Sequence, residues 1–569
     1  MIRLYFLISL FFVIQLNANA IKELSFKGDI DLVIGDFSRD KLLRVCDIHY
    51  PPFFKFWQEK PSFNLYQIQI CQDSILEYSK SLGFYNADIS YEIQNSSATI
   101  YINKNNPIFV SSIKIDEDYK KLLLLKENDH FTTAKFTQSK NNIKNFLSHT
   151  GYPKGELDAK AYVDLDKYQV DMVFEVSKGE PHYFGTYTIQ NDAKVESHLI
   201  EKQIQFKQGD LYNSLALEDT YEGLYNFGIY QYIAVEPDMT TNTNQVPVHI
   251  ELQQGAYREL GYGFGYDTDR GANVKASYKN DNFYGNLKKF KIGALVNQKG
   301  YKIDNNLFVP QIPIKAQIFD DVSVSNDISF EDMDYESYSQ QKIDERITLS
   351  KDFFGTTNSI GFLSETSKIK SKLAEYKSGN YWLNAPFYEI VLDRRDSSLN
   401  PKNGYYVSFY IEKGSKFFIS EIDYTKTLTE LRYIKSFSDI TASFKTTIGT
   451  LDRNLPIFKH FFAGGDYSNR GYQYQMVGET DPDGNPYGGL SMIDTTLEVE
   501  YYITDDLGVA TFYDTTMLSR QTNTWNDKFY DSVGLGVRYY TPIGPLRIDF
   551  GFPLKKGGFV FHIGIGQVF

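Results

Sequence analysis

The chain has 569 residues, a formal net charge of −13 and 16% aromatic residues, among them 44 Tyr and 43 Phe. This length exceeds that of one ordinary domain, so several domains are expected. The negative charge argues against nucleic acid as a partner, because nucleic-acid-binding proteins present basic patches to the phosphates. No internal segment approaches the roughly 18 continuous apolar residues of a membrane-spanning helix. Aromatic enrichment without such runs is typical of membrane strands, in which every second residue faces a polar interior.

Residues 1–20 have the pattern of an export signal. Arg3 supplies a positive charge, residues 4–16 form a short apolar core, and residues 18–20 read Ala-Asn-Ala, a cleavage site of the A-x-A type. The core is too short to cross a bilayer as a helix. We therefore expect the mature chain to begin at Ile21 in the periplasm; the alternative is a buried N-terminal helix.

Cys46 and Cys71 are the only cysteines of the chain. In an oxidising periplasm a disulfide between them would close a loop of about 25 residues. Two free, buried thiols are the alternative. Metal binding would need more ligands than the nearby His49, so no metal site is predicted.

Residues 21–255 contain three segments with one plan: a strand, two helices, a tight turn with Gly and an aromatic residue, and two strands. The turns lie at residues 82–85, 150–153 and 227–230. Their glycines recur after 68 and then 77 residues, which is the spacing of an internal repeat. We predict three β-α-α-β-β modules, at 21–105, 106–180 and 181–255. Such modules leave strand edges that can template an incoming strand, although they could equally serve as spacers.

From residue 256 to residue 569, alternating strands replace this mixed pattern. One early strand places large apolar side chains on one face and glycines on the other: Leu260, Tyr262, Phe264 and Tyr266 against Gly261, Gly263 and Gly265. A membrane strand takes about 9–11 residues, so this region accommodates an antiparallel transmembrane β-barrel of roughly 16 strands. A soluble β-sandwich array would not explain the aromatic content.

Such a barrel would close at a seam between its first strand, at about 257–267, and its last strand, at 557–569. Glycines lie on the lumen face of both strands, and each glycine weakens a strand by about 0.5–1 kcal/mol. The seam residues that we single out are Gly261, Gly263, Gly265, Gly564, Gly566 and Phe569. A weak closure could open sideways and present unpaired strand edges. Alternatively, the glycines only relieve crowding in the lumen.

Three motifs carry a family resemblance. Residues 464–472 read GGDYSNRGY, residues 393–406 read DRRDSSLNPKNGYY and residues 539–554 read YYTPIGPLRIDFGFPL. With the repeated modules and a terminal Phe, the chain resembles the BamA/TamA superfamily, in which POTRA modules precede an outer-membrane barrel. The resemblance identifies the first motif with the family's sixth extracellular loop, which folds back into the lumen. The loop residues concerned are Gly464, Gly465, Arg470, Gly471 and Tyr472.

Arg470 needs a partner in the lumen, because an isolated guanidinium away from water is costly. Strand parity places Glu498, Glu500 and Asp514 in the lumen. The family pairs this arginine with acidic residues of these two strands, and we take Glu500 and Asp514 as the matching positions. A bidentate contact would hold the loop in one register. This pairing could serve barrel stability alone, or it could set the conformation of the seam.

No hydrolase or metalloprotease motif occurs, so we expect neither enzymatic activity nor a cofactor. The three modules are most similar to TamA-type members of the superfamily. The resemblance implies assembly or insertion of other proteins into the outer membrane by strand-edge templating at the seam. It also implies three partners: client outer-membrane proteins, outer-membrane lipid, and a TamB-type protein anchored in the inner membrane that binds the modules. A two-partner-type secretion pore, a BamA-like general insertase and a passive porin are the alternatives.

Overall fold

The computed structural model describes residues 21–31, 35–51, 59–311, 321–504, 506–541, 544–555 and 557–565. The predicted export signal at 1–20 lies outside these residues, as do Gly566 and Phe569. The chain divides into two compact units, one of Met1–Ile189, Gln203–Glu222 and Ala234–Ile250 and one of Gln190–Lys202, Gly223–Ile233 and Glu251–Phe569. None of the helices in the described part of the chain is long and apolar enough to cross a membrane.

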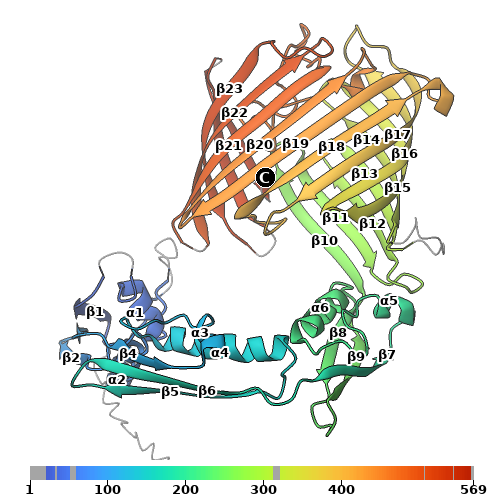
Figure 1. Cartoon of the computed structure of the whole chain (residues 1–569). Helices are drawn as coiled ribbons and strands as arrows, with labels where there is room; N and C mark the ends of the chain where they lie inside the picture. The colour runs from blue at the N-terminus through green and yellow to red at the C-terminus, as the bar shows by residue number, and fades with distance from the viewer. Residues whose placement is uncertain are drawn as a thin grey trace, which may run out of the picture. The chain divides into compact units, whose positions relative to one another are not determined.

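Three small sheets with accompanying helices precede the barrel (Figure 1). Their strand orders are β1-β3-β2, β4-β6-β5 and β7-β9-β8, so the last strand of each module is central. The strands are Glu23–Gly28 (β1), Asp88–Gln94 (β2), Ser97–Asn103 (β3), Phe109–Lys114 (β4), Glu156–Asp164 (β5), Gln169–Ser177 (β6), Tyr183–Asn191 (β7), Tyr230–Pro237 (β8) and Gln245–Gln254 (β9). The helices are Arg39–Val45 (α1), Leu65–Ser81 (α2), Glu117–Lys120 (α3), Thr133–His149 (α4), Ser197–Glu201 (α5) and Ser214–Tyr225 (α6). The order within each module is the β-α-α-β-β plan that the sequence predicts.

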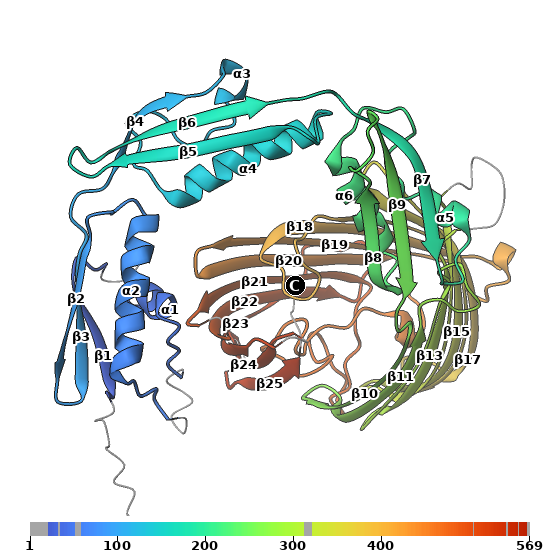
Figure 2. The same cartoon turned by 90° about the horizontal axis from the view of Figure 1, so that it is seen from below.

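The second module shows why these residues form this layer. Ile143 and Leu147 are four positions apart and therefore share one face of α4. They pack in a common core with Val170, Met172 and Phe174, which alternate along β6. Figure 2 shows α4 lying along the sheet of β5 and β6. The hydrophobic period of each element thus decides which face the other element covers.

In the first module a covalent bond joins the two helices. The sulfur atoms of Cys46, directly after α1, and Cys71, within α2, are 1.96 Å apart and form a disulfide. Helix α2 begins at a capping box, in which the side chain of Asn64 accepts from the backbone of Gln67 and the side chain of Gln67 accepts from the backbone of Asn64, each at 2.9 Å. The bridge ties this well-capped helix to α1.

Sixteen antiparallel strands form one sheet that curls into a nearly closed barrel, in unbroken chain order from β10 to β25 (Figure 1). The strands are Arg258–Asp267 (β10), Gly271–Asn280 (β11), Lys289–Asn297 (β12), Gly300–Val309 (β13), Ser323–Asp334 (β14), Tyr338–Phe353 (β15), Thr356–Ser371 (β16), Gly379–Asp393 (β17), Asn403–Gly414 (β18), Tyr424–Phe437 (β19), Ile440–Leu451 (β20), Ser491–Tyr502 (β21), Leu507–Ser519 (β22), Phe529–Tyr539 (β23), Leu546–Pro553 (β24) and Val560–Ile565 (β25). Short 3-10 helices lie at Lys416–Phe418 and Ile457–Lys459. The fold class and the strand number are those that the sequence predicts.

Alternation along the strands makes the outside of the barrel apolar. Leu260, Tyr262 and Phe264 of β10 are 79–85% exposed, whereas Glu498 of β21 and Asp514 of β22 are buried in the interior. Because side chains alternate between the two faces of a strand, one face can suit lipid while the other carries charge. The interior is therefore where polar chemistry is to be sought.

Candidate functional site: the lumen loop and the seam

The segment between β20 and β21, residues 452–490, is a long loop that packs inside the barrel. Its apolar side chains share one buried cluster with side chains of the barrel wall. The loop contributes Leu455, Phe461, Ala463, Tyr472, Val477 and Leu490, and the wall contributes Leu383, Ala385, Tyr424, Leu451, Met492 and Leu518. Burial of this apolar surface holds the loop in the lumen, where the polar contacts described next fix its register.

Arg470 is the centre of the polar contacts. Its Nε and Nη2 donate to the two carboxylate oxygens of Asp514, each at 3.0 Å, and its backbone N–H donates to the same carboxylate at 3.0 Å. Its Nη1 donates to Glu498. The guanidinium also lies 3.3 Å above the ring centroid of Phe512 and is fully buried. Two carboxylates and an aromatic face therefore compensate the cost of removing this cation from water.

The structure brings Arg470 to Asp514, as the sequence predicts, but the prediction of Glu500 as its second partner is wrong. In the β21–β22 ladder, Thr496 lies opposite Asp514, Glu498 is two pairs further along and Glu500 four pairs further along. Two residues along a strand span about 7 Å, so Glu498 is within reach of Arg470 and Glu500 is not. Parity gives the face on which a carboxylate lies but not its position along the barrel axis.

Glu500 belongs to the neighbouring part of the same network. It accepts from the hydroxyls of Tyr502 at 3.0 Å and Tyr540 at 2.9 Å, and its carboxylate is 3.4 Å from Nε of Arg538. Arg538 also contacts Glu498 at 3.1 Å. Glu500 thus supports Arg470 only indirectly, through the arginine that both glutamates share.

Two buried arginines of the network were not predicted from the sequence. Arg538 of β23 donates to Asp549 at 2.6 Å, and Arg547 of β24 lies 3.4 Å from Asp549 and 3.5 Å from Asp466 of the loop. Both are at most 1% exposed. The parity argument that found Asp514 would have found them, because Arg547 and Asp549 alternate with outward-facing apolar residues. The network therefore joins the loop to four consecutive strands, β21 to β24.

The glycines of the loop have different roles. Gly464 and Gly465 have φ angles of +104° and +105°, a conformation that residues with a Cβ rarely adopt. A Cβ at Gly471 would lie 2.4 Å from Cβ of Ser532, so this glycine permits close approach to β23. Tyr472 is 6% exposed and packs edge-on against Tyr530 of the wall, with ring centroids 5.9 Å apart.

A second buried ion pair, which the sequence did not reveal, holds the loop to another part of the wall. Nζ of Lys459 donates to Glu365 of β16 at 2.7 Å and lies 3.8 Å from Glu412 of β18. The next residue, His460, has its ring nitrogens 2.9 and 3.0 Å from the carbonyl oxygens of Leu455 and Tyr487. The loop is therefore anchored twice, by Arg470 and by Lys459.

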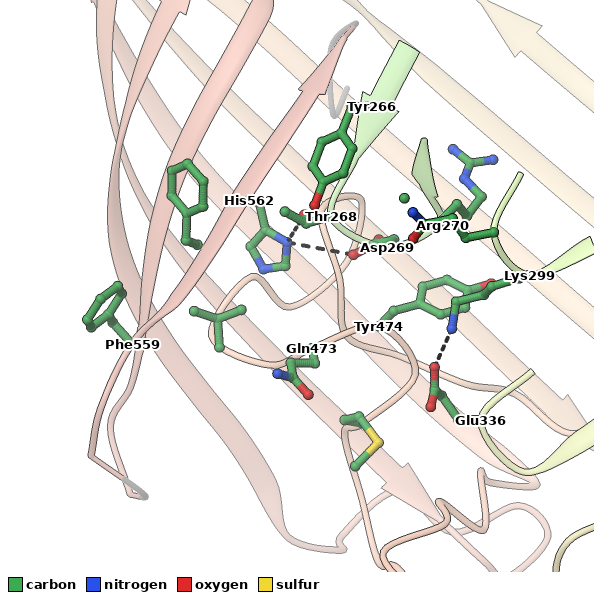
Figure 3. A pocket seen from close by; sticks show the side chains of 15 residues that line it. Tyr266, Thr268, Asp269, Arg270, Lys299, Glu336, Gln473, Tyr474, Phe559 and His562 are labelled. Atoms are coloured by element: carbon green, nitrogen blue, oxygen red, sulfur yellow. Dashed lines mark hydrogen bonds and ion pairs between the residues drawn. The ribbon is translucent and has the colours of Figure 1, made fainter. Parts of the chain in front are cut away.

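The seam between β10 and β25 has no backbone ladder among the described residues, where these strands are the two ends of the sheet. Side chains meet there instead. Figure 3 shows His562 of β25 directed toward the β10–β11 turn, with its Nδ1 3.2 Å from the hydroxyl of Thr268 and 3.7 Å from the carboxylate of Asp269. A cavity of about 570 Å³ opens beside these residues, lined in part by Arg270, Lys299, Glu336 and Tyr474.

The lumen loop contacts both edges of this seam. The backbone N–H of Asp466 donates to Asp269, next to β10, at 3.0 Å. The hydroxyl of Tyr467 donates to the carbonyl oxygen of Ile565 in β25 at 2.9 Å. The same loop segment that Arg470 fixes on the wall therefore also bridges the open ends of the sheet.

The seam glycines support both of the roles that the sequence left open. A Cβ at Gly564 would lie 2.7 Å from the carboxylate of Asp466, and a Cβ at Gly261 would lie 2.6 Å from the hydroxyl of Ser277, so crowding accounts for both. Gly263 has open space around it, which crowding does not explain. Gly265 is intermediate, with the Asn273 side chain at 3.0 Å from a Cβ.

A barrel with an apolar outer face, a charged interior, an inserted loop and preceding β-α-α-β-β modules defines an outer-membrane protein with periplasmic modules. The Omp85 superfamily domain matches residues 282–569, and a POTRA model described as a surface antigen variable number repeat matches residues 108–179. The chain belongs to the Omp85 superfamily. This confirms the resemblance inferred from the motifs, and it places the protein in the outer membrane with its modules in the periplasm.

The chain is similar to two outer membrane protein assembly factors called BamA. The protein of Nitratidesulfovibrio vulgaris is 22% identical over 467 residues, which is 78% of this chain and 58% of that protein. The protein of Neisseria meningitidis is 18% identical over 602 residues, which is 91% of this chain and 74% of that protein. The crystal structure of Haemophilus ducreyi BamA lacking POTRA domains 1–3 superposes with a TM-score of 0.62 at 17% identity, over 81% of this chain and 98% of that one.

Proposed function

We propose that this protein assembles or inserts other proteins into the outer membrane at the seam between β10 and β25. The observation that carries the proposal is that, within the residues that the structure describes, side chains and the lumen loop rather than a strand ladder join the two ends of the sheet. An edge strand without a partner offers backbone N–H and C=O groups to an incoming strand. The two BamA proteins are named as assembly factors, which supports the same reading.

The loop is the element that would control access to the seam. Asp466 contacts one edge and Tyr467 the other, and both are within four residues of Arg470. The carbonyl oxygen of Arg470 also lies 3.0 Å from Nε2 of His562 in β25. A displacement of this segment would therefore remove the contacts of the loop with both edges together, without a bound nucleotide.

Within the superfamily we propose a TamA-type role, with a TamB-type periplasmic protein as the partner of the first module, residues 21–105. Three modules in the described chain support this choice over a general insertase. The chain spans 58% of the Nitratidesulfovibrio vulgaris BamA. The apolar outer face of the barrel would contact outer-membrane lipid, and unfolded barrels would be the clients.

Quantitative proteomics of the outer membrane after depletion of this protein tests the proposal. A complemented strain that expresses the wild-type chain is the control. Loss of a small subset of barrels from viable cells is the expected result. General loss of barrels with cell death would instead indicate a BamA-like general insertase. Loss of one secreted protein from the medium, with the membrane proteome unchanged, would indicate a dedicated secretion pore and overturn the proposal.

A further inference from the structure

The turn between β11 and β12, residues 281–288, has an unusual backbone. Four consecutive residues, Tyr284, Gly285, Asn286 and Leu287, have φ angles of 56°, 89°, 57° and 58°. This left-handed region is unfavourable for residues with a Cβ, and only glycine and, to a lesser degree, asparagine adopt it readily. A run of such residues persists only where surrounding contacts over-determine it.

Contacts within the turn provide part of that support. The side-chain oxygen of Asn282 accepts from the backbone of Leu287 at 2.9 Å, and its carbonyl oxygen accepts from Gly285 at 3.1 Å. Phe283 stacks on Phe290 with ring centroids 4.9 Å apart. Asn282 and Leu287 are both buried, so the turn is packed rather than a loose surface loop.

The rest of the support comes from residues 194–196, which precede α5 and belong to the same compact unit as the barrel. The backbone N–H of Asn286 donates to the carbonyl oxygen of Lys194 at 2.8 Å. The side chain of Asn286 accepts from the backbone of Glu196 at 3.0 Å and donates to its carboxylate at 2.7 Å. A Cβ at Gly285 would lie 2.9 Å from the carbonyl oxygen of Lys194, so glycine is needed for this approach.

The same turn contacts the N-terminal end of β10. The backbone N–H of Asp281 donates to the carbonyl oxygen of Tyr257 at 2.8 Å, and Arg258, the first residue of β10, pairs with Asn280. β10 is one edge of the seam, and in the described residues its only ladder is to β11. A movement of the turn would therefore act directly on the start of an edge strand.

We propose that residues 281–288 form a joint that couples the segment 190–202 to the seam edge β10, with Asn286 and Glu196 as its positioning residues. When the joint is intact, three hydrogen bonds to residues 194–196 fix the turn and, through it, the start of β10. When the joint is released, the first residues of β10 separate from β11 more readily. The coupling itself does not depend on the proposed function. Only its use rests on that function, because the segment 190–202 would then influence how easily the seam opens.

Hydrogen–deuterium exchange of the full chain in lipid nanodiscs tests this joint. Asn286→Gly removes the side-chain contacts but still permits a φ near 57°, so it tests the contact rather than the strain. Glu196→Ala removes one of these contacts, the hydrogen bond from the Asn286 side chain to the carboxylate, and keeps the backbone N–H donor of residue 196. Asn95→Gly, at a left-handed asparagine with φ 55° in the β2–β3 turn, is the matched control.

We expect amides at 258–262 to exchange about three- to tenfold faster in either variant, the ratio that the loss of one or two ordinary hydrogen bonds produces. The double variant should exchange no faster than Asn286→Gly, because that change already removes the contact that Glu196→Ala removes. The control should exchange like the wild type in this region.

Two results would overturn the joint. One is faster exchange confined to residues 190–202, which would make the contact a tether without effect on β10. The other is unchanged exchange in both regions. Neither readout needs a client protein, so the joint can fail while the proposed function stands, and the proteomic test can fail while the joint stands.

Discussion

Arg470 is a cation without solvent contact, so each of its partners matters more than a surface ion pair would. Arg470→Ala would leave the Asp514 carboxylate buried without its arginine partner and Glu498 with Arg538 alone, at a cost of about 3–5 kcal/mol. We expect lower abundance in the membrane, weaker client assembly and faster proteolysis near residues 464–472. Arg470→Lys should be intermediate, because it restores the charge but not the two-point contact. Wild-type assembly by the alanine variant at normal abundance would contradict this role.

Glu498 and Glu500 form a matched pair for testing the network, because they lie on one face of one strand. Glu498→Gln removes a charge that contacts both Arg470 and Arg538, and it should release the loop to protease. Glu500→Gln should have a smaller effect on the loop, because Glu500 contacts Arg538 and two tyrosine hydroxyls. Limited proteolysis of the two variants side by side measures the difference. Equal effects would support the pairing of Arg470 with Glu500 that the sequence predicted.

For the two glutamates, the sequence predicts the face of the strand but not the partner of each side chain. A period of two assigns both side chains to the lumen, because it depends only on local backbone geometry. Which glutamate meets Arg470 depends on the β21–β22 register, which is fixed by the whole ladder. The ion pair of Lys459 and Glu365 could not be predicted from local sequence for the same reason, since 94 residues separate its members.

His130 provides a pH-dependent contribution to the stability of the periplasmic modules. Its ring packs against Phe84 at 5.4 Å and Phe109 at 6.1 Å, and burial lowers the pKa of the imidazole below its ordinary value of 6.5. The unfolded chain therefore binds a proton more readily than the folded chain, so stability should fall as the pH drops below 6.5. Urea unfolding of the modules at pH 7.5 and 5.0 measures this change. His130→Phe should remove this part of the dependence; an unchanged pH profile would show that His130 does not contribute.

At the scale of elements, the disulfide between Cys46 and Cys71 holds α1 to α2. Removing it with the double change Cys46→Ala and Cys71→Ala would free a loop of about 25 residues in the unfolded chain and cost about 3–4 kcal/mol on the chain-entropy model. We expect faster amide exchange across residues 65–103 and unchanged exchange in the second module, residues 109–177. Equal protection of the first module in both proteins would show that its apolar core suffices alone.

The order of elements was predictable because each segment carries its own hydrophobic period. The three β-α-α-β-β modules and the alternating strands of the barrel follow from such local patterns. The state of the seam was not predictable from them. Glycines at 261, 263 and 265 are compatible with a weak edge and with a crowded lumen, and only contacts between β10, β25 and the loop separate these readings.

At the scale of the whole barrel, the two loop anchors are attached to different parts of the wall. Arg470 contacts β21 and β22, whereas Lys459 contacts β16 and β18. The apolar cluster of the loop extends beyond both contacts along the chain, so release of one anchor leaves the loop held by the other anchor and by this cluster. The lumen should therefore stay obstructed until both anchors are lost.

Ion conductance in planar bilayers tests this arrangement. Lys459→Met and Arg470→Ala should each leave the conductance near the low wild-type level, and the double variant should conduct far more than the two single variants together, because each anchor compensates for the loss of the other. Lys413→Met, at a half-exposed lysine of β18 that contacts Thr425 at 2.9 Å, is the control. Full conductance from Arg470→Ala alone would mean that Lys459 does not hold the loop. The closed lumen would then depend on the Arg470 network, and the seam and the pore would open by the same step.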